Sequence, residues 1–334
     1  MLEKLLIALA IAGPFSSTDY KCPPPGWEQK LIIHHINVGQ GDATFVRTPS
    51  GTSILIDAGL PKMGRSKVIP TLRHCYKLKK LDYVIATHFD GDHIGGLPDV
   101  FRRFKIGRVL DPGDGSMKKP IKENGLSNKY RRAALKRQRV IPKLGIGEIV
   151  SNDNVKFTII SVNGKILGGK QIDLFKKGEL KNKNATSIVL KIGYGTFDYL
   201  IGGDTTGGGN QTPNVERLFA KVVGDIDVLH ANHHGSNTSN SSYLLNWTAP
   251  EFVIISVGNS GLNKVYSLPN KNVLQRFLTH PNVKMVFQTS SGLSKINLGR
   301  LIMNKIRNEK GDIIIEAGPS SFTINDIRFL TDEK

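Results

Sequence analysis

The sequence predicts an α/β protein in which two β-sheets carry helices on their outer faces. Short apolar segments rich in Val and Ile alternate with segments of helical periodicity along most of the chain. This pattern occurs in two similar halves rather than as one continuous series of strand–helix–strand units. The chain has 334 residues, 39% of them hydrophobic, which is enough to bury a sizeable core. We predict one domain over residues 29–330, after an N-terminal extension of residues 1–28.

The first half contains strands that end in glycine or polar residues. LIIHHINVGQGDATFVRTP predicts two strands around a turn at Gly39–Gly41. TSILIDAG and LDYVIAT are short apolar runs, typical of buried strands that end in loops, and GRVLDPG is a further strand. The predicted helices of this half cover Lys67–Tyr76, Leu97–Phe104 and a region near Asn128–Gln138.

The second half repeats the alternation. Its predicted strands are VKFTIIS, TSIVLKIGYG, FDYLIGGD, DIDVLHANHHGS, EFVIISVGN, VKMVFQTS, SKINL, DIIIEA and SFTI. Helices are expected over Asn214–Val222 and Asn270–Thr279. In a fold of this kind, functional side chains gather where the loops at the strand ends converge.

One loop is rich in groups that can bind a metal. THFDGDHIGG places His88, Asp90, Asp92 and His93 within six positions, directly after a buried strand. This spacing cannot point all four side chains one way on a helix or strand, whereas a tight loop can. Four such groups in one cavity are costly unless a cation neutralises them, which favours a metal site over a solvated acidic turn.

Two distant segments can complete the site. YLIGGDTTGGG places Asp204 at the end of an apolar strand, where a carboxylate can bridge two cations. LHANHHGSNTS places His230, His233 and His234 at the end of another strand. The remaining histidines, His34, His35, His74 and His280, lack such a context and are interpreted as structural or surface residues.

These motifs resemble the metallo-β-lactamase fold superfamily. THFDGDHIGGL is similar to its H-x-[HD]-x-D-H signature. INVGQGDATFV, LIDAG, NATSIVLKI, YLIGGDT, HHGSNTSNS and IISVGNS follow in the order of the branch typified by the hydrolase domain of competence DNA-uptake (ComEC-type) proteins. The resemblance covers about Ile32 to Ile324, and it implies an αββα sandwich with a dinuclear metal site at one edge.

The resemblance also implies roles for individual residues. His88 and Asp90 match ligands of the first metal site, Asp92 and His93 match ligands of the second, and Asp204 matches the bridging carboxylate. Either histidine of the HHGS motif can be the last ligand, and we prefer His234 because it directly precedes Gly-Ser.

Further residues receive supporting roles. His233 is the candidate group for substrate contact or proton transfer, and Asp92 is expected to serve catalysis as well as ligation. Asp57 matches the aspartate that braces the site from behind. Two positions depart from the pattern. Asn184 is the nearest residue to a missing third first-site histidine, and Leu268 replaces the histidine of a Tyr-x-His-Pro motif.

The resemblance and the donor set together predict two divalent metal ions. Zn²⁺ or Mn²⁺ is expected, with Mg²⁺ as a further candidate, because Asp90 makes the first site richer in oxygen than an all-imidazole site.

Charge points to an anionic partner. The formal net charge is +18, and residues 118–143 hold ten Lys and Arg against one acid. This balance favours nucleic acid, DNA more than RNA, as a substrate. We expect Arg131, Arg132, Lys136 and Arg137 to hold the phosphate backbone without reading sequence. The alternative is that YRRAALKRQR is an ordinary solvated helix face. Protein partners stay unknown.

Three functions are compatible with these features. The preferred one is a phosphodiesterase or nuclease that cleaves DNA through a hydroxide activated by two metals. The second is hydrolysis of a small phosphodiester or another ester, since the branch includes phosphorylcholine esterases. The third is a nucleic-acid-binding module with a degenerate site.

The N-terminus and the cysteines bear on localisation. The apolar run Leu5–Ala12 is too short to span a bilayer, so no stable membrane span is predicted. It resembles a weak signal peptide, with a short helix as the alternative. Sequons beside the candidate site argue against a glycosylating compartment; a cytoplasmic location is slightly favoured, and bacterial secretion stays open. Cys22 and Cys75 form no C-x-x-C motif, which excludes zinc ribbons and dithiol redox motifs; they are either a disulfide or two buried thiols.

Overall fold

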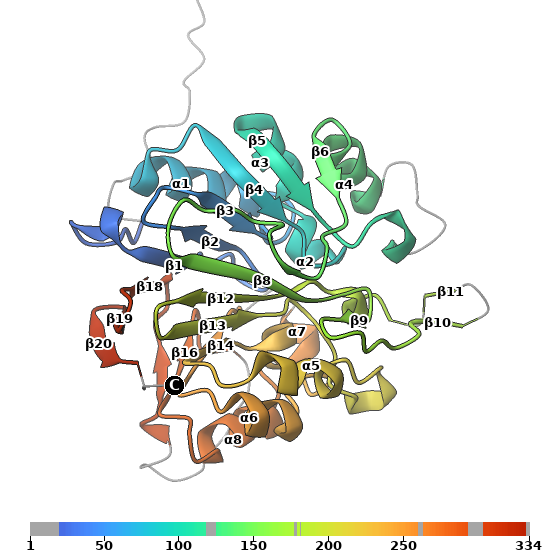
Figure 1. The fold of residues 1–334 in the computed structure, drawn as a ribbon, viewed down its shortest axis with the longest axis vertical. Coiled ribbons are helices and arrows are strands. Elements are labelled where there is room, and N and C mark those ends of the chain that lie inside the picture. The colour runs from blue at the N-terminus through green and yellow to red at the C-terminus, as the bar shows by residue number, and fades with distance from the viewer. Residues whose placement is uncertain are drawn as a thin grey trace, which may run out of the picture.

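The fold is an αββα sandwich, as predicted (Figure 1). A computed structural model describes residues 20–117, 125–176, 179–180, 182–259, 263–292 and 303–331. Two large sheets face each other, and helices cover the outer face of each sheet. The N-terminal apolar run, the predicted strand SKINL and the start of the basic stretch (residues 118–124) lie outside the described residues.

The first sheet joins the beginning and the end of the domain, in the order β20-β19-β18-β1-β2-β3-β4-β5-β6. The run from β3 to β6 is parallel and the rest is antiparallel. The strands are β1 (Leu31–His35), β2 (Thr44–Arg47), β3 (Ser53–Ile56), β4 (Lys80–Ile85), β5 (Lys105–Leu110), β6 (Gln138–Val140), β18 (Ile313–Ala317), β19 (Ser321–Ile324) and β20 (Ile327–Leu330).

The second sheet has the order β17-β16-β15-β14-β13-β12-β8-β7, with β9 paired to β8. The run from β13 to β17 is parallel. Its strands are β7 (Gly145–Ile146), β8 (Val155–Val162), β9 (Lys165–Ile166), β12 (Val189–Tyr194), β13 (Phe197–Ile201), β14 (Val228–His230), β15 (Phe252–Ile255), β16 (Met285–Gln288) and β17 (Ile306–Asn308). A separate two-stranded ribbon consists of β10 (Phe175–Lys176) and β11 (Glu179–Leu180).

All five predicted helices are present with shifted ends. The described helices are α1 (Ile69–Tyr76), α2 (Gly91–Ile94), α3 (Leu97–Arg103), α4 (Leu126–Ala134), α5 (Glu216–Val223), α6 (Ser242–Thr248), α7 (Asn263–Tyr266) and α8 (Lys271–Thr279). Among the described residues, none of the helices has the length and apolar character needed to cross a bilayer.

One helix prediction needs correction, and the short helices α2, α6 and α7 lie outside the predicted set. The helix expected near Asn128–Gln138 ends at Ala134, because the chain turns and Gln138 begins β6, which pairs with Arg108 of β5. Helix α6 was not predicted. Ser241 caps its N-terminus by accepting a hydrogen bond from the Leu244 amide at 3.2 Å.

The central strands of each sheet are buried on both faces, and this explains why they lack an alternation of apolar and polar residues. Every residue of β1 is buried. Ile33 belongs to the apolar cluster between the sheets, whereas Ile32 belongs to the cluster under the helices of the first sheet. A third cluster lies between the second sheet and α5, α6 and α8. A strand covered on both faces loses the alternation of apolar and polar residues.

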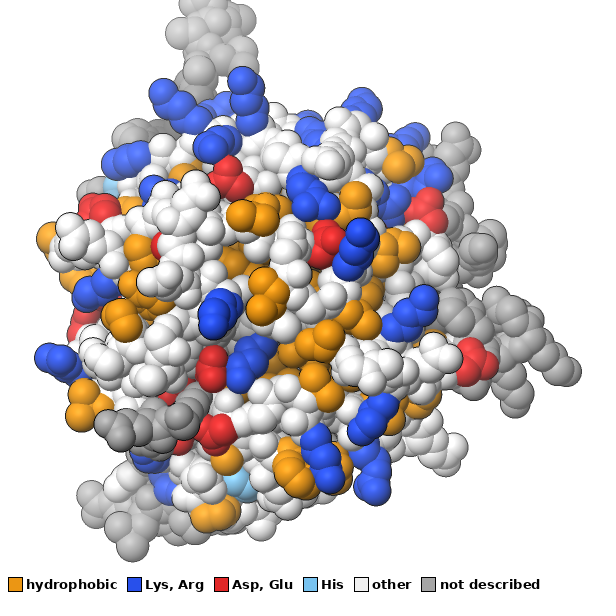
Figure 2. All heavy atoms as spheres, viewed as in Figure 1, with side chains coloured by type: hydrophobic (Ala, Val, Ile, Leu, Met, Phe, Trp, Pro, Cys, Tyr) orange, Lys and Arg blue, Asp and Glu red, His pale blue; other side chains and the backbone are white. Residues whose placement is uncertain are grey.

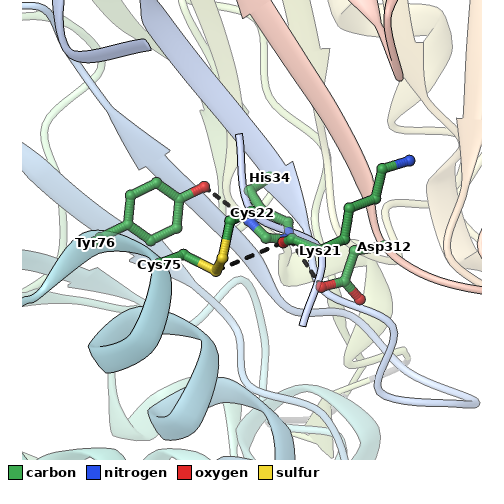
Figure 3. Close-up of a disulfide and its surroundings, with 6 residues drawn as sticks. All are labelled: Lys21, Cys22, His34, Cys75, Tyr76 and Asp312. Atoms are coloured by element: carbon green, nitrogen blue, oxygen red, sulfur yellow. Dashed lines mark hydrogen bonds and ion pairs between the residues drawn. A yellow bond between two sulfur atoms is a disulfide. The ribbon is translucent and has the colours of Figure 1, made fainter. Parts of the chain in front are cut away.

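A disulfide fixes the chain ahead of β1, as Figure 3 shows. Cys22 bonds to Cys75 near the end of α1, with 5.2 Å between their Cα atoms. Beside this bond, the buried His34 ring contacts the Tyr76 hydroxyl at 2.7 Å and Asp312 at 2.9 Å (Figure 3). The arm before β1, α1 and the start of β18 are therefore linked, and the two cysteines are not separate thiols.

Candidate metal centre

Loops from both sheets meet at one edge of the sandwich. The His88–His93 loop follows β4, Asp204 follows β13, and His234 follows β14 in a short turn (Asn232–Gly235). Backbone hydrogen bonds hold these loops together. Within the first sheet the Asp42 amide donates to the Asp92 carbonyl at 3.1 Å, within the second the His233 amide donates to the Gly203 carbonyl at 2.9 Å, and the Ile188 amide before β12 donates to the Thr87 carbonyl after β4 at 3.0 Å. Both sheets therefore contribute to one site.

The two glycines after the metal loop are required by close packing. A Cβ on Gly95 would lie 2.3 Å from the Pro61 nitrogen, and a Cβ on Gly96 would lie 2.2 Å from the Ala58 carbonyl oxygen. Any side chain at these positions would push the loop away from the segment that follows β3. That segment carries Asp57, so the glycines bring Asp57 and the metal loop together.

Three histidines are held in the same way. His88, His93 and His234 are buried, and each Nδ1 has a hydrogen-bonding partner. The partners are the Thr87 hydroxyl at 3.2 Å, the Asp57 carboxylate at 2.8 Å and the Ser256 carbonyl at 3.0 Å. Each Nε2 is buried and has no hydrogen-bonding partner. Three orphaned imidazole nitrogens with braced rings are the arrangement that metal ligation requires.

Asp204 lies between two groups of side chains. Its Oδ1 is 3.1 Å from His93 Nε2 and 3.7 Å from His234 Nε2. Its Oδ2 is 3.6 Å from His88 Nε2 and 3.4 Å from His233 Nε2. One carboxylate with each oxygen directed at a different group can bridge two cations.

These contacts define two sides of the centre. The His93 side consists of Asp92, His93 and His234, and Asp92 Oδ2 lies 3.4 Å from His234 Nε2. The His88 side consists of His88, Asp90, His233 and Asn184, and Asp90 Oδ2 lies 3.7 Å from His88 Nε2. All six predicted metal ligands, together with His233 and Asn184, therefore lie in one cluster around Asp204.

The pKa shifts of the buried side chains show that the carboxylates of the cluster require positive charge beside them. Burial alone would raise the pKa of Asp204, but the surrounding imidazoles, His233 foremost, hold it well below its usual value. Burial alone would lower the pKa of His234, but Asp42, Asp204 and Asp92 raise it to about 9. Burial would likewise lower the pKa of His93, but Asp204 and Asp57 raise it well above its usual value. Divalent cations would supply the charge that these carboxylates otherwise draw from protonated histidines.

Asp57 braces the site from behind. Besides contacting His93 Nδ1, its carboxylate accepts hydrogen bonds from the Thr87 amide at 2.9 Å and the Thr87 hydroxyl at 2.6 Å. The residue has a positive φ of 59°, a conformation that is uncommon outside glycine and occurs at constrained functional loops. Its position corresponds to the bracing role that the resemblance implies.

Asp42 is a site residue that the sequence analysis missed. Ligand atoms of Asp42, His93, Asp204 and His234 all lie within 4.8 Å of one another. Asp42 approaches the Nδ1 atoms of His93 (3.9 Å) and His234 (3.6 Å), while Asp204 approaches their Nε2 atoms. We therefore place Asp42 behind the rings of His93 and His234, on the side opposite to Asp204. A lone carboxylate directly after the Gly39–Gly41 turn was the available signal.

The two histidines of the HHGS motif differ in exposure. Both have positive φ values, 53° for His233 and 52° for His234, so the turn points their rings differently from a regular helix. The His234 side chain is 1% exposed, whereas that of His233 is 25% exposed and its Nδ1 contacts the Thr238 hydroxyl at 2.8 Å. His230 lies deeper, with Nε2 2.9 Å from the Ser256 hydroxyl.

The His88 side contains two features of its own. The Asn184 amide nitrogen lies 3.4 Å from Asp204 Oδ2 and 3.4 Å from His233 Nε2, in the region of the missing histidine. The Lys183 ammonium forms an ion pair with Asp90 Oδ1. Lys183 was also missed, because its neighbours Lys181 and Asn182 give it no distinguishing pattern in the sequence.

Four basic residues of the predicted phosphate-binding surface divide into two pairs. Arg132 and Lys136 are exposed. Arg131 forms an ion pair with Asp114 at 2.5 Å, and the Arg137 guanidinium lies over the Phe101 ring, 5.1 Å from its centroid. Half of the predicted surface therefore also stabilises the fold.

The segment that carries these residues, α4 and the turn after it, is close to the metal loop. The Tyr130 ring of α4 packs against Phe89 of the loop, with 5.6 Å between ring centroids. On the face drawn in Figure 2, Lys and Arg side chains are scattered among polar and hydrophobic side chains instead of forming one patch.

The turn that lacks the expected histidine packs against the site. Leu268 is buried in the apolar cluster under the second sheet. Its aliphatic side chain cannot replace the polar group of the expected histidine. The Asn270 amide donates to the Gly235 carbonyl at 2.8 Å, and a Cβ on Gly235 would lie 2.7 Å from Pro269 Cβ. This turn therefore supports the HHGS loop through packing and one backbone hydrogen bond.

Comparison with known proteins identifies the family. The Metallo-beta-lactamase superfamily profile matches residues 36–255, about two thirds of the chain. The chain belongs to the metallo-β-lactamase superfamily. Its metal loop, Asp204 and the HHGS turn all lie within the matched residues.

Competence proteins are among the relatives of this metallo-β-lactamase domain, as the motif order indicated. ComE operon protein 3 of Bacillus subtilis is 28% identical over 264 residues, which covers 74% of this chain and 30% of that protein. Competence protein ComA of Neisseria gonorrhoeae is 27% identical over 275 residues, which covers 82% of this chain and 33% of that protein. The chain spans about a third of the length of these relatives.

A solved structure resembles the fold more distantly. The structure of a new diphosphatase from the PhnP family aligns with a TM-score of 0.42 and 15% identity, covering 80% of this chain and 98% of that one. This likeness concerns the fold alone, whereas the match to the superfamily profile supports a metal-dependent hydrolase.

Proposed function

We propose that this metallo-β-lactamase domain is a phosphodiesterase that cleaves nucleic acid, DNA in preference to RNA. The observation that carries the proposal is the placement of Asp204, whose two oxygens face two separate sets of imidazoles. Zn²⁺ or Mn²⁺ would be held by Asp92, His93, His234 and Asp204 on the His93 side. On the His88 side, His88, Asp90 and Asp204 would hold the second ion.

When bound, two divalent cations supply an activated water and stabilise charge on the phosphate oxygens. The protein residues supply the geometry. Asp57 and the Ser256 carbonyl fix the rings of His93 and His234, so that both Nε2 atoms face Asp204. Asp92 completes the His93 side. His233 is partly exposed beside Asp204, and when its Nδ1 accepts a hydrogen bond from the Thr238 hydroxyl, its Nε2 can donate to a phosphate oxygen.

Charge supports a polyanionic substrate. The chain carries a net charge of +18. Arg132 lies on α4 and Lys136 lies just after it, and both are exposed. Helix α4 packs against the metal loop through Tyr130 and Phe89. Non-specific binding of nucleic acid depends on such phosphate contacts. The names of the relatives as competence proteins agree with a role in handling DNA.

A small-ester hydrolase is the second candidate, and one observation favours it. Arg131 and Arg137 are engaged within the protein, by Asp114 and by Phe101 respectively, which reduces the charge free to hold a polymer. The same centre would then act on a small phosphodiester.

One experiment separates these functions. Metal-loaded protein is incubated with plasmid DNA and with bis-p-nitrophenyl phosphate, and Asp204→Asn serves as the control. Cleavage of DNA that is lost in Asp204→Asn supports the proposal. Cleavage of the small ester alone supports the second candidate, and DNA binding with no cleavage of either substrate supports a non-catalytic binding module.

We further infer that the domain works in an oxidising compartment, because disulfides such as Cys22–Cys75 persist there and are rare in the reducing cytosol. This inference favours bacterial secretion, which the sequence left open, over the cytoplasmic location that it slightly favoured. Protein isolated without reductant should show no free thiol until it is denatured and reduced, when both cysteines should react. Two reactive thiols in unreduced, denatured protein would overturn it.

A further inference from the structure

The His88 side of the centre is poorer in ligands than the His93 side. Besides Asp204 Oδ1, the His93 side offers Asp92, His93 and His234 as ligands. The His88 side offers His88 and Asp90. Its remaining imidazole, His233, is 25% exposed and its Nε2 lies 3.4 Å from the Asn184 amide nitrogen, which also faces Asp204. A cation on the His88 side is therefore expected to be held more weakly.

A lysine already occupies part of the His88 side. The Lys183 ammonium pairs with Asp90 Oδ1, while Asp90 Oδ2 faces His88 Nε2. Among the ion pairs of the described residues, Lys183 is the one Lys or Arg side chain bonded to a candidate metal ligand. The Lys183 ammonium therefore occupies an oxygen of Asp90 that a divalent cation on the His88 side would use.

The side chain of Lys183 has room to leave. Its backbone is anchored, because the Lys183 carbonyl accepts hydrogen bonds from the Thr186 amide at 3.0 Å and the Thr186 hydroxyl at 2.6 Å. Its side chain is 41% exposed, compared with 18% for Asp90. A long side chain on an anchored backbone can move its charge between Asp90 and solvent.

We propose that Lys183 is a built-in counter-cation that competes with the metal on the His88 side. Without that metal, the ammonium neutralises Asp90. When the metal binds, repulsion between like charges displaces the ammonium toward solvent, where it can contact a phosphate oxygen of the substrate. Lys183 thereby causes a divalent cation to bind on the His93 side first. Binding of the second cation on the His88 side is then favoured by an anionic substrate, which contacts the displaced ammonium. This inference rests on the two-cation centre proposed above.

The test is a Mn²⁺ binding isotherm of the full chain. Lys183→Met removes the charge and keeps the aliphatic stem, and Lys183→Arg keeps the charge. Lys30→Met is the matched control, because the Lys30 side chain is 43% exposed and pairs with Glu316 on β18, away from the centre. Thermal melts of all variants establish that each is folded.

The expected isotherm of the wild type has a tight first step and a weaker second step. In Lys183→Met the second dissociation constant should fall at least about tenfold, because a like charge has been removed from the immediate neighbourhood. The first step should not change, and Lys183→Arg and Lys30→Met should behave as the wild type does. Inorganic phosphate should bind more weakly to Mn²⁺-loaded Lys183→Met than to the loaded wild type.

Each contrary outcome has a separate meaning. A Lys183→Met isotherm that superimposes on a two-step wild-type isotherm overturns the competition and leaves the two-cation centre intact. One Mn²⁺ per chain in both proteins overturns the inference and the two-cation centre together. A tighter second step with unchanged phosphate binding retains the competition and overturns the interaction with substrate.

Discussion

The two sides of Asp204 differ in how completely the protein has prepared them for a cation. On the His93 side, Asp57 and the Ser256 carbonyl fix two histidine rings whose Nε2 atoms are buried without hydrogen-bonding partners, whereas the His88 side has one such histidine. On the His88 side, Asn184 and Lys183 direct N–H groups toward the carboxylates. One half of the centre is therefore rigid and rich in ligands, whereas the other is open to competition and to substrate.

The largest effect should come from the residue that belongs to both sides. Asp204→Asn should reduce hydrolytic activity by more than about 100-fold, beyond the range usual for residues outside the ligand set. Asp90→Asn should cost less, because Asp90 serves only the His88 side. Rates measured at saturating Mn²⁺ decide the order. Equal losses, or a larger loss for Asp90→Asn, would show that Asp204 is not the bridge.

Removing the His93 side should abolish tight metal binding. Asp92→Ala combined with His93→Ala deletes two of its ligands, and elemental analysis after dialysis should find no retained ion. His88→Ala combined with Asp90→Ala is the matched variant, and it should retain one. If the second variant loses all metal and the first does not, the ranking of the two sides is reversed.

A smaller loss is expected from the residue behind the His93 side. Asp57→Asn keeps the size of the side chain but removes the charge that orients His93, and activity should fall about 10- to 100-fold. Asp82→Asn is the control, because Asp82 also accepts hydrogen bonds from a backbone amide and a hydroxyl, those of Ser53, away from the centre. Equal losses in the two variants would mean that Asp57 acts on stability alone.

The sequence could predict much of this arrangement, and the reasons are physical. β15 is an uninterrupted apolar run, and β4 and β13 end in buried apolar residues, so all three strands were evident. The metal loop, Asp204 and the HHGS motif each come directly after such a run. Helix α6 was missed because it has no strong flanking signal except Ser241 at its N-cap.

The residues that were missed depend on tertiary contacts. Asp42 is far from the metal loop along the chain, and only the packing of the β1–β2 turn against Asp92 brings it to the site. Lys183 is one of several lysines in its segment, and only the fold pairs it with Asp90. Similarly, no spacing shows that Arg131 and Arg137 have partners inside the protein.

The smallest effect should come from α4 and the turn after it, outside the centre. Arg132→Ala with Lys136→Ala removes exposed charges, and the slope of log K for duplex DNA against log[salt] should flatten by about 0.9 for each phosphate that the protein no longer binds. Arg131→Ala with Arg137→Ala should change the slope less and lower the melting temperature, because those side chains contact Asp114 and Phe101. Unchanged slopes in both variants would favour the small-ester hydrolase.

Electron paramagnetic resonance of the Mn²⁺-loaded protein tests the central claim most directly, because two Mn²⁺ ions that share one carboxylate are magnetically coupled. The spectrum should show an isolated ion at one equivalent of Mn²⁺ and a coupled pair at two equivalents. In Asp204→Asn the coupled signal should be absent. A wild-type spectrum that shows only isolated ions when two are bound, or only one bound ion at excess Mn²⁺, would contradict a centre bridged by Asp204.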